Sequence, residues 1–320
     1  MLDKSDPIGD MEQDMGYFRT SLMLAALTAL FMGVGWLLGG TAGMAIALGV
    51  AVAMNFYAFW NSDRLALSRH NAEMVSASSH PQLYALVTEL ADRAGLPPPK
   101  IAVIQSAAPN AFATGRSPEK GVVAVTTGLL DLLNPDELAG VIAHELAHIQ
   151  HRDTLTMTIA ATIGGAISML AQFALFFGGG RNRGVLGFIG VILAALLAPI
   201  AAMLIQMLVS RSREYVADRT GAEISGAPLV LASALQKLSA RAGRVEMATA
   251  ERNPASAHLF IVNPLSGARM DNLFSTHPSA ENRIAALRAM AETMPPRPHR
   301  AAATRQNSMP VVRRRRGPWA

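Results

Sequence analysis

The stretch "GVIAHELAHIQHRDT", from Gly140 to Thr154, places two histidines four residues apart, with a glutamate directly after the first. Residues four apart on a helix lie on one face, so His144 and His148 can direct their imidazoles at one metal ion. Glu145 lies about 100° round the helix from His144, which suits a carboxylate that contacts a water molecule at the metal. The spacing predicts a zinc site in which Glu145 takes a proton from the attacking water.

This motif needs support from its context, because a histidine pair on a helix can also be an ordinary pair in a core or on a surface. Two imidazoles favour zinc over calcium or magnesium, which prefer oxygen ligands. The helix has a well-marked start: Asn134 can cap it, Pro135 fits the first helical position, and Glu137 stands at the capping-box spacing. Since its first turn is polar, we expect the helix to begin in water rather than in lipid.

A catalytic zinc site needs a third protein ligand and an open position for water. On an unbroken helix His151 would lie about 10 Å along the axis from His144, too far for three rings to converge. Glu214 and Asp218 stand four apart in "SRSREYVADRTGAE", Ser210 to Glu223. One of these carboxylates could bind zinc while the other orients a ligating histidine. The alternative is that both acids are solvated and pair with neighbouring arginines.

The composition is typical of a membrane protein, since 51% of the 320 residues are hydrophobic and only 16% are charged. Residues 20–62 contain no charge, and neither do residues 154–180 or 184–210. A bilayer core needs about 20 apolar residues per helix. These runs therefore predict four transmembrane helices, two of them in 20–62 with a turn near Leu37 to Gly43. The alternative is a large soluble core, but soluble helices of this length normally carry a polar face.

Basic residues near the ends of the predicted transmembrane helices set their orientation. Two lie on one side, Arg181 and Arg183, and eight on the other: Lys4, Arg19, Arg64, Arg69, Arg152, Arg211, Arg213 and Arg219. This distribution predicts that both termini and the polar segments are cytoplasmic. Residues 1–19 carry five acids against two basic residues, which argues against a cleaved signal peptide. The net charge of +5 comes largely from the flanking residues and from Arg313 to Arg316, so we predict no nucleic-acid partner.

The two polar segments predict the parts of one catalytic domain. Short apolar runs at 100–105 and 121–128 predict strands of a small sheet, with "NAFATG" at 110–115 near its edge, and a helix is predicted from Pro81 to Ala94. The predicted order is a cytoplasmic N-terminus (1–19), a transmembrane hairpin (20–62), a first catalytic part (63–153), a second transmembrane hairpin (154–210), a second catalytic part (211–294) and a disordered basic tail (295–320).

HELAH, two predicted transmembrane helices, "REYVAD" and then "FSTHPSAENRIAAL" at Phe274 to Leu287 follow one another in this chain. In this order they resemble the membrane-bound zinc metallopeptidases of the HtpX type, relatives of the CAAX prenyl protease Ste24. The resemblance runs from the first hairpin to about residue 290. It implies a mainly α membrane protein with four transmembrane helices and a cytoplasmic zincin-like α+β catalytic domain. It also implies a zinc endopeptidase of the bacterial inner membrane, which takes part in stress response and quality control of misfolded or damaged membrane proteins.

The resemblance also implies a specific zinc site, through the residues of this chain that match the family's motifs. His144, His148 and Glu214 would bind one zinc ion, Glu145 would be the catalytic base, and Asp218 would orient a ligand. These assignments agree with the spacing argument and choose Glu214, rather than Asp218, as the third ligand.

The resemblance also brings His277 and Arg283 near the catalytic centre, where a cation or an N–H donor could stabilise the oxyanion of the intermediate. The alternative for His277 is that it caps a helix beginning at Pro278. Asn110 would hold the substrate backbone at a strand edge that pairs with an extended peptide. Otherwise, Asn110 is a turn residue after Pro109.

Three other functions compete with zinc-dependent cleavage outside the bilayer. Intramembrane proteolysis would need the HExxH helix inside a transmembrane segment, and the polar residues at both ends of this helix argue against that. A membrane scaffold with structural zinc would usually use four protein ligands, often cysteine, and the chain has none. A transporter would carry ionisable residues within its transmembrane helices, which the predicted ones lack.

Overall fold

The described residues form a mixed sheet of four strands. The computed structural model describes residues 60–155, 157, 211–242, 244–252, 254–264 and 279–294, and some of the residues in 25–57. Their strands are β1 (Ala72–Val75), β2 (Lys100–Ile104), β3 (Ala111–Thr114) and β4 (Val122–Thr126), in the order β1-β2-β4-β3. β1 and β2 are antiparallel, β2 and β4 parallel, and β3 and β4 antiparallel. β3 is therefore an edge strand, where the "NAFATG" stretch was expected.

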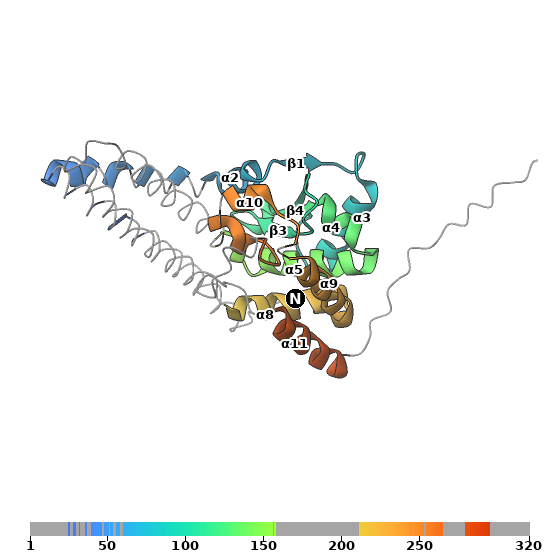
Figure 1. Ribbon diagram of the computed structural model, residues 1–320. Helices are drawn as coiled ribbons and strands as arrows, with labels where there is room; N and C mark the ends of the chain where they lie inside the picture. The colour runs from blue at the N-terminus through green and yellow to red at the C-terminus, as the bar shows by residue number, and fades with distance from the viewer. Residues whose placement is uncertain are drawn as a thin grey trace, which may run out of the picture.

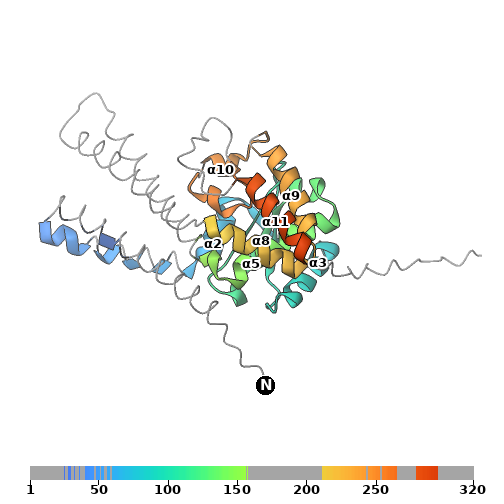
Figure 2. The same ribbon diagram turned by 90° about the horizontal axis from the view of Figure 1, so that it is seen from below.

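The helices lie on and around this sheet (Figure 1). They are α2 (Ser62–Arg69), α3 (Pro81–Arg93), α4 (Thr127–Leu132), α5 (Pro135–Gln150), α8 (Arg211–Ser225), α9 (Pro228–Arg241), α10 (Ala248–Arg252) and α11 (Ala280–Thr293), with short 3₁₀ helices at Pro118–Lys120 and Pro254–Leu259. α5 occupies the centre, since it contacts β3 and β4 as well as α3, α8 and α9. α11 packs against α8 and α9 on the side away from the sheet (Figure 2).

The start of α5 is the predicted capping box. Asn134 Oδ1 accepts a hydrogen bond of 2.9 Å from the Glu137 N–H, and Glu137 Oε2 accepts one of 3.1 Å from the Asn134 N–H. Glu137 also accepts hydrogen bonds from Ser233 and Lys237 of α9. The residues that begin the helix therefore also join it to α9. The predicted helix at 81–94 is α3, which ends one residue earlier at Arg93.

Apolar clusters cover both faces of the sheet, because side chains along a strand point alternately to the two faces. Val123 and Val125 of β4 belong to the larger cluster, which they form with α3, α5, α8 and α9. Ala124 of β4 and Phe112 of β3 belong to a smaller cluster that includes Phe260. All residues of β3 and β4 are consequently buried.

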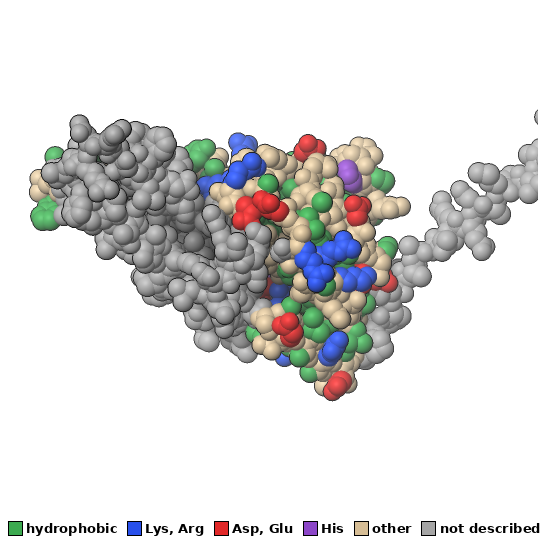
Figure 3. Space-filling model, in the orientation of Figure 1, with side chains coloured by type: hydrophobic (Ala, Val, Ile, Leu, Met, Phe, Trp, Pro, Cys, Tyr) green, Lys and Arg blue, Asp and Glu red, His purple; other side chains and the backbone are tan. Residues whose placement is uncertain are grey.

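No helix formed by the described residues is long and apolar enough to cross a bilayer. The predicted transmembrane hairpins at 20–62 and 154–210 lie largely outside these residues, as do the N-terminus at 1–19 and the tail at 295–320. The described residues of 36–60 are helical and extend away from the sheet (Figure 1). They expose large apolar side chains: Trp36, Ile46, Leu48, Val50, Val52, Phe56, Tyr57 and Trp60. The described surface around the sheet instead carries acidic and basic side chains in small groups (Figure 3).

Candidate active site

Close packing of α8 against α5 brings the two halves of the site together. A Cβ atom on Gly221 of α8 would lie 2.8 Å from both the N and Cα atoms of His144 on α5. Only glycine allows the two backbones to approach this closely. Next to the same interface, His151 Nε2 lies 3.1 Å from Thr220 Oγ1. His151 thus contacts α8 and lies outside the metal cluster, as the helix geometry predicted.

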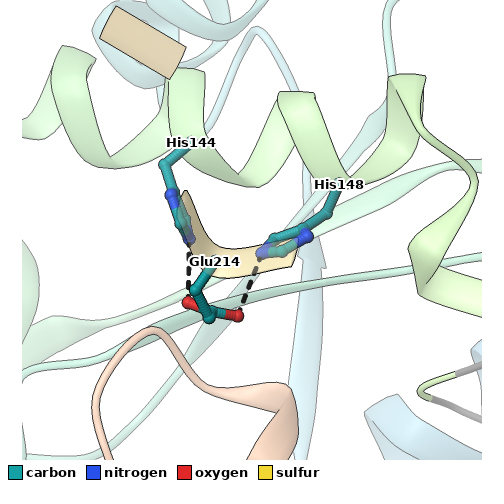
Figure 4. Close-up of side chains that lie close together, drawn as sticks. All are labelled: His144, His148 and Glu214. Carbon is teal, nitrogen blue, oxygen red and sulfur yellow. Dashed lines mark ion pairs between the residues drawn. The ribbon is translucent and has the colours of Figure 1, made fainter. Parts of the chain in front are cut away.

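His144, His148 and Glu214 converge on one point (Figure 4). His144 Nε2 lies 3.7 Å from Glu214 Oε2, and His148 Nε2 lies 3.6 Å from Glu214 Oε1. One ligand atom from each residue can be chosen so that all three lie within 4.8 Å of one another. The two imidazoles come from successive turns of α5 and the carboxylate from the first turn of α8.

The donor set fits zinc. Zinc–nitrogen and zinc–oxygen bonds of about 2.0–2.1 Å in a tetrahedral site place neighbouring ligand atoms about 3.4 Å apart, close to both nitrogen–oxygen distances in the cluster. Three protein ligands also leave one position for water or substrate. Beside them, Glu145 Oε1 is buried and has no hydrogen-bond partner among the described residues. An unpaired buried carboxylate oxygen next to an open coordination position is suited to contact the attacking water.

Burial raises the pKa of Glu145 to about 7, well above the ordinary value for a glutamate. A carboxyl group with such a pKa can accept a proton and return it at neutral pH. Glu145 is 1% exposed, so bulk solvent has little access to its oxygens. These properties agree with the predicted role of a general base.

Asp218 lies on the far side of His144, with Oδ1 3.0 Å from Nδ1. The pKa of Asp218 is lowered overall. Burial alone would raise this pKa, but the charge and hydrogen bonds of Arg283 outweigh burial, so the carboxylate stays ionised. An ionised carboxylate at Nδ1 leaves Nε2 to face Glu214. The structure thus places Asp218 where the resemblance expected an orienting residue.

Asp153 has the same relationship to His148, and the sequence prediction missed it. Asp153 Oδ2 lies 3.2 Å from His148 Nδ1. Burial lowers the pKa of His148, but the hydrogen bond to Asp153 and the charge of Glu214 outweigh it and raise this pKa to about 9. A metal ion must displace that proton in order to bind the imidazole. The sequence signal for this contact is an acid five residues after His148, among the polar residues at the end of the helix.

Arg283 is buried against the cluster. Its Nη1 lies 3.1 Å from Glu214 Oε2 and donates a hydrogen bond of 3.0 Å to the Ile261 carbonyl, and its Nη2 lies 3.5 Å from His144 Nε2. Together with the bonds to Asp218, these contacts occupy the guanidinium inside the chain. Stabilisation of an oxyanion by Arg283 stays a prediction, whereas the contacts themselves favour a role in holding the ligands.

Asn110 is already hydrogen-bonded within the chain, so the predicted contact with a substrate backbone would require it to release a partner. Asn110 Nδ2 donates a hydrogen bond of 2.9 Å to the Val262 carbonyl, and the Ile261 N–H donates one of 3.1 Å to the Ala111 carbonyl. A segment of the chain itself therefore pairs with the start of β3. His277 lies outside the described residues, so its predicted place near the catalytic centre stays a prediction.

Comparisons with known proteins give a similar solved structure and a matching family model. The crystal structure of Ste24p from S. mikatae is similar to this chain, with 19% sequence identity and a TM-score of 0.47, over 87% of this chain and 67% of that one. Residues 77–291, which include both histidines of the motif, Glu214 and Arg283, match peptidase family M48. This match confirms the recognition of an HtpX/Ste24-type metallopeptidase from the sequence. The chain therefore belongs to peptidase family M48, a family of zinc metalloproteases.

Proposed function

We propose that this chain is a membrane-bound endopeptidase that cleaves internal peptide bonds on the cytoplasmic side of a bacterial inner membrane. The observation that carries the proposal is the convergence of His144, His148 and Glu214 beside Glu145, whose buried Oε1 has no hydrogen-bond partner among the described residues. Two imidazoles, one carboxylate and a buried base are the parts that zinc-dependent peptide hydrolysis requires.

His144, His148 and Glu214 would hold one zinc ion per chain. Zinc bound there would polarise the scissile carbonyl and lower the pKa of the attacking water. Glu145 would remove a proton from that water as it attacks and then pass the proton to the leaving amine. Asp218 keeps the Nδ1 face of His144 occupied, so that Nε2 stays directed at the cluster.

We propose misfolded or damaged membrane proteins as substrates, in a quality-control role. Two features support a place at the lipid bilayer: the uncharged runs at 20–62 and 154–210, and the exposed apolar side chains of the described residues in 36–60. The basic residues that flank these runs support a cytoplasmic active site. Nucleic acid is not among the proposed partners.

The test is cleavage of a denatured membrane protein by the purified wild type and by Glu145→Gln, with bound zinc measured in both. We expect about one zinc per chain in each protein, and cleavage slower by at least about 100-fold in the variant. Glu223→Gln, an exposed glutamate on α8, serves as the matched control and should cleave like the wild type. Equal cleavage by wild type and Glu145→Gln would refute the proposal.

The positions of the cuts separate this proposal from intramembrane proteolysis. A substrate with a single transmembrane helix should be cut in its cytoplasmic part. Cuts inside the apolar segment would favour the rival function. A wild type that holds zinc but cleaves nothing would favour a scaffold.

A further inference from the structure

Asp153 is a buried carboxylate that the proposed reaction does not use. It follows the end of α5 and is 8% exposed. Arg152, just before it, has a φ of 57°, in the left-handed region that residues other than glycine rarely adopt. On an unbroken helix Asp153 would lie about 140° round the axis from His148. The turn at Arg152 ends the helix and lets Asp153 reach back to that imidazole.

Both oxygens of Asp153 have partners that connect the two halves of the site. Oδ2 lies 3.2 Å from His148 Nδ1, and Oδ1 accepts a hydrogen bond of 2.7 Å from Arg213 Nη1. A carboxylate can only accept hydrogen bonds, so His148 Nδ1 carries the proton and Nε2 is left for a metal. We call His148, Asp153 and Arg213 the Asp153 triplet.

A second set of residues repeats this arrangement on the other imidazole. His144 Nδ1 lies 3.0 Å from Asp218 Oδ1, and Arg283 donates hydrogen bonds of 2.7 Å to both oxygens of Asp218. We call His144, Asp218 and Arg283 the Asp218 triplet. Each of the two proposed histidine ligands thus has an aspartate at Nδ1 and an arginine behind the aspartate. An isolated surface ion pair would not show this repetition around one centre.

The Asp153 triplet also joins the chain on either side of residues 154–210. Asp153 follows α5, whereas Arg213 lies in the first turn of α8, directly before Glu214. The adjacent Thr154 Oγ1 donates a hydrogen bond of 2.9 Å to the Gly115 carbonyl at the end of β3. One carboxylate therefore fixes the imidazole of His148 relative to the helix that supplies Glu214.

We propose that Asp153 and Arg213 are positioning residues, which hold His148 with Nε2 directed at the metal and fix the start of α8 beside it. This inference rests on the proposed zinc site and adds two residues to it. Neither residue would touch the substrate. Their loss should therefore act through metal binding, because partners of this kind typically contribute tenfold to hundredfold in metal affinity.

The test measures the zinc dissociation constant of the full-length protein in detergent, by competition with a chromophoric chelator. The variants are Asp153→Asn, which keeps the size of the side chain, and Arg213→Met, which leaves the Asp153 contact with His148 in place. Arg213→Lys tests rescue by a conservative cation. Asp136→Asn on α5 and Arg219→Met on α8 are matched controls at exposed positions. The absorption spectrum of the cobalt(II)-substituted protein reports coordination geometry independently of activity.

We expect Asp153→Asn to weaken zinc binding by about 10-fold to 100-fold, with an altered cobalt spectrum. Arg213→Met should weaken binding by a smaller factor, and Arg213→Lys should recover part of it. The double variant Asp153→Asn/Arg213→Met should lose no more zinc affinity than the two single fold-losses multiplied together. The reason is that both changes break one connected set of bonds. At saturating zinc, kcat should return towards the wild-type value while KM stays unchanged.

Zinc affinities and cobalt spectra that match the controls would overturn the inference and leave the proposed function standing. If Asp153→Asn instead lowers thermal stability equally with and without zinc while zinc affinity is unchanged, Asp153 is a structural ion pair, and the inference is also overturned. A wild-type chain that binds no zinc would overturn the inference and the proposed function together.

Discussion

Arg283 donates two parallel hydrogen bonds to Asp218, from Nε to Oδ2 and from Nη2 to Oδ1, each 2.7 Å long. Both side chains are buried, and the same guanidinium lies 3.1 Å from Glu214. A planar guanidinium supplies this paired geometry, which an ammonium group cannot reproduce. Arg283 thereby connects α11 to two of the residues around the metal cluster.

Arg283→Lys should weaken zinc binding by about tenfold, because Asp218 loses one of two parallel bonds and His144 loses a fixed partner. Steady-state cleavage at limiting and at saturating zinc separates two roles. If Arg283 positions the ligands, saturating zinc restores most of kcat. If it stabilises the oxyanion instead, kcat stays low when the site is full. Arg288→Lys on the same helix is the control and should resemble the wild type.

At Arg152, which follows α5, replacement by glycine should give a more stable protein than replacement by alanine. Arg152→Gly and Arg152→Ala both delete the side chain, so their comparison isolates the backbone φ of 57°. We expect the glycine variant to be more stable by about 1 kcal/mol, since a Cβ atom is disfavoured in the left-handed region. Thermal unfolding of the two variants in detergent measures the difference. Greater stability of the alanine variant would mean that the turn has another conformation.

Gly221→Ala should disrupt the approach of α8 to α5. Its Cβ would meet backbone atoms of His144 at 2.8 Å, and a backbone cannot move aside as a flexible side chain can. We expect a loss of about 1–3 kcal/mol in the free energy of unfolding, together with weaker zinc binding. Gly140→Ala is a graded control, because its Cβ would lie 3.2 Å from Leu231, away from the cluster. Unchanged zinc affinity in Gly221→Ala would contradict the packing account.

His70 should make the metal-free protein less stable in acid. Burial lowers its pKa to about 4 from the ordinary 6.5, and the charge of Arg69 adds to this effect. The folded state thus keeps His70 neutral, while the unfolded state binds a proton below about pH 6.5. Stability present at pH 7 is therefore lost as the pH falls from about 6.5 to about 4, by about 3 kcal/mol for this group.

The matched variant for this effect is His70→Phe, since His70 packs against Phe112 and Phe260 with ring centroids 5.6 and 5.0 Å away. Unfolding free energies of both proteins at pH 7.5 and pH 4.5, in the presence of a chelator, measure the difference. The variant should lose about 2.5 kcal/mol less than the wild type over this interval. Parallel losses would show that His70 does not titrate in this way.

Local signals made most of the central helix predictable. The capping box at Asn134 and Glu137 and the spacing of His144 and His148 lie within one segment, so sequence distance determines their geometry. The third member, Glu214, lies on another helix, and spacing alone left it and Asp218 as alternatives until the resemblance favoured Glu214. The structure does bring Glu214 to both histidines.

Other features had no signal of this kind. Asp153 reaches His148 only because Arg152 adopts a left-handed φ, and arginine gives no indication of that conformation. Asn110 binds the main chain of Val262, 152 residues away, and no pattern near either residue predicts the contact. β1 escaped prediction because it has four residues, none of them fully buried, which leaves no clear alternation.

The most direct test of the metal site is the zinc K-edge X-ray absorption spectrum of the purified wild-type protein. We expect one zinc per chain, with two imidazole nitrogens and at least one carboxylate oxygen at about 2.0–2.2 Å. A protein without stoichiometric zinc, or a zinc shell that lacks imidazole, would contradict the assignment of His144, His148 and Glu214 as its ligands.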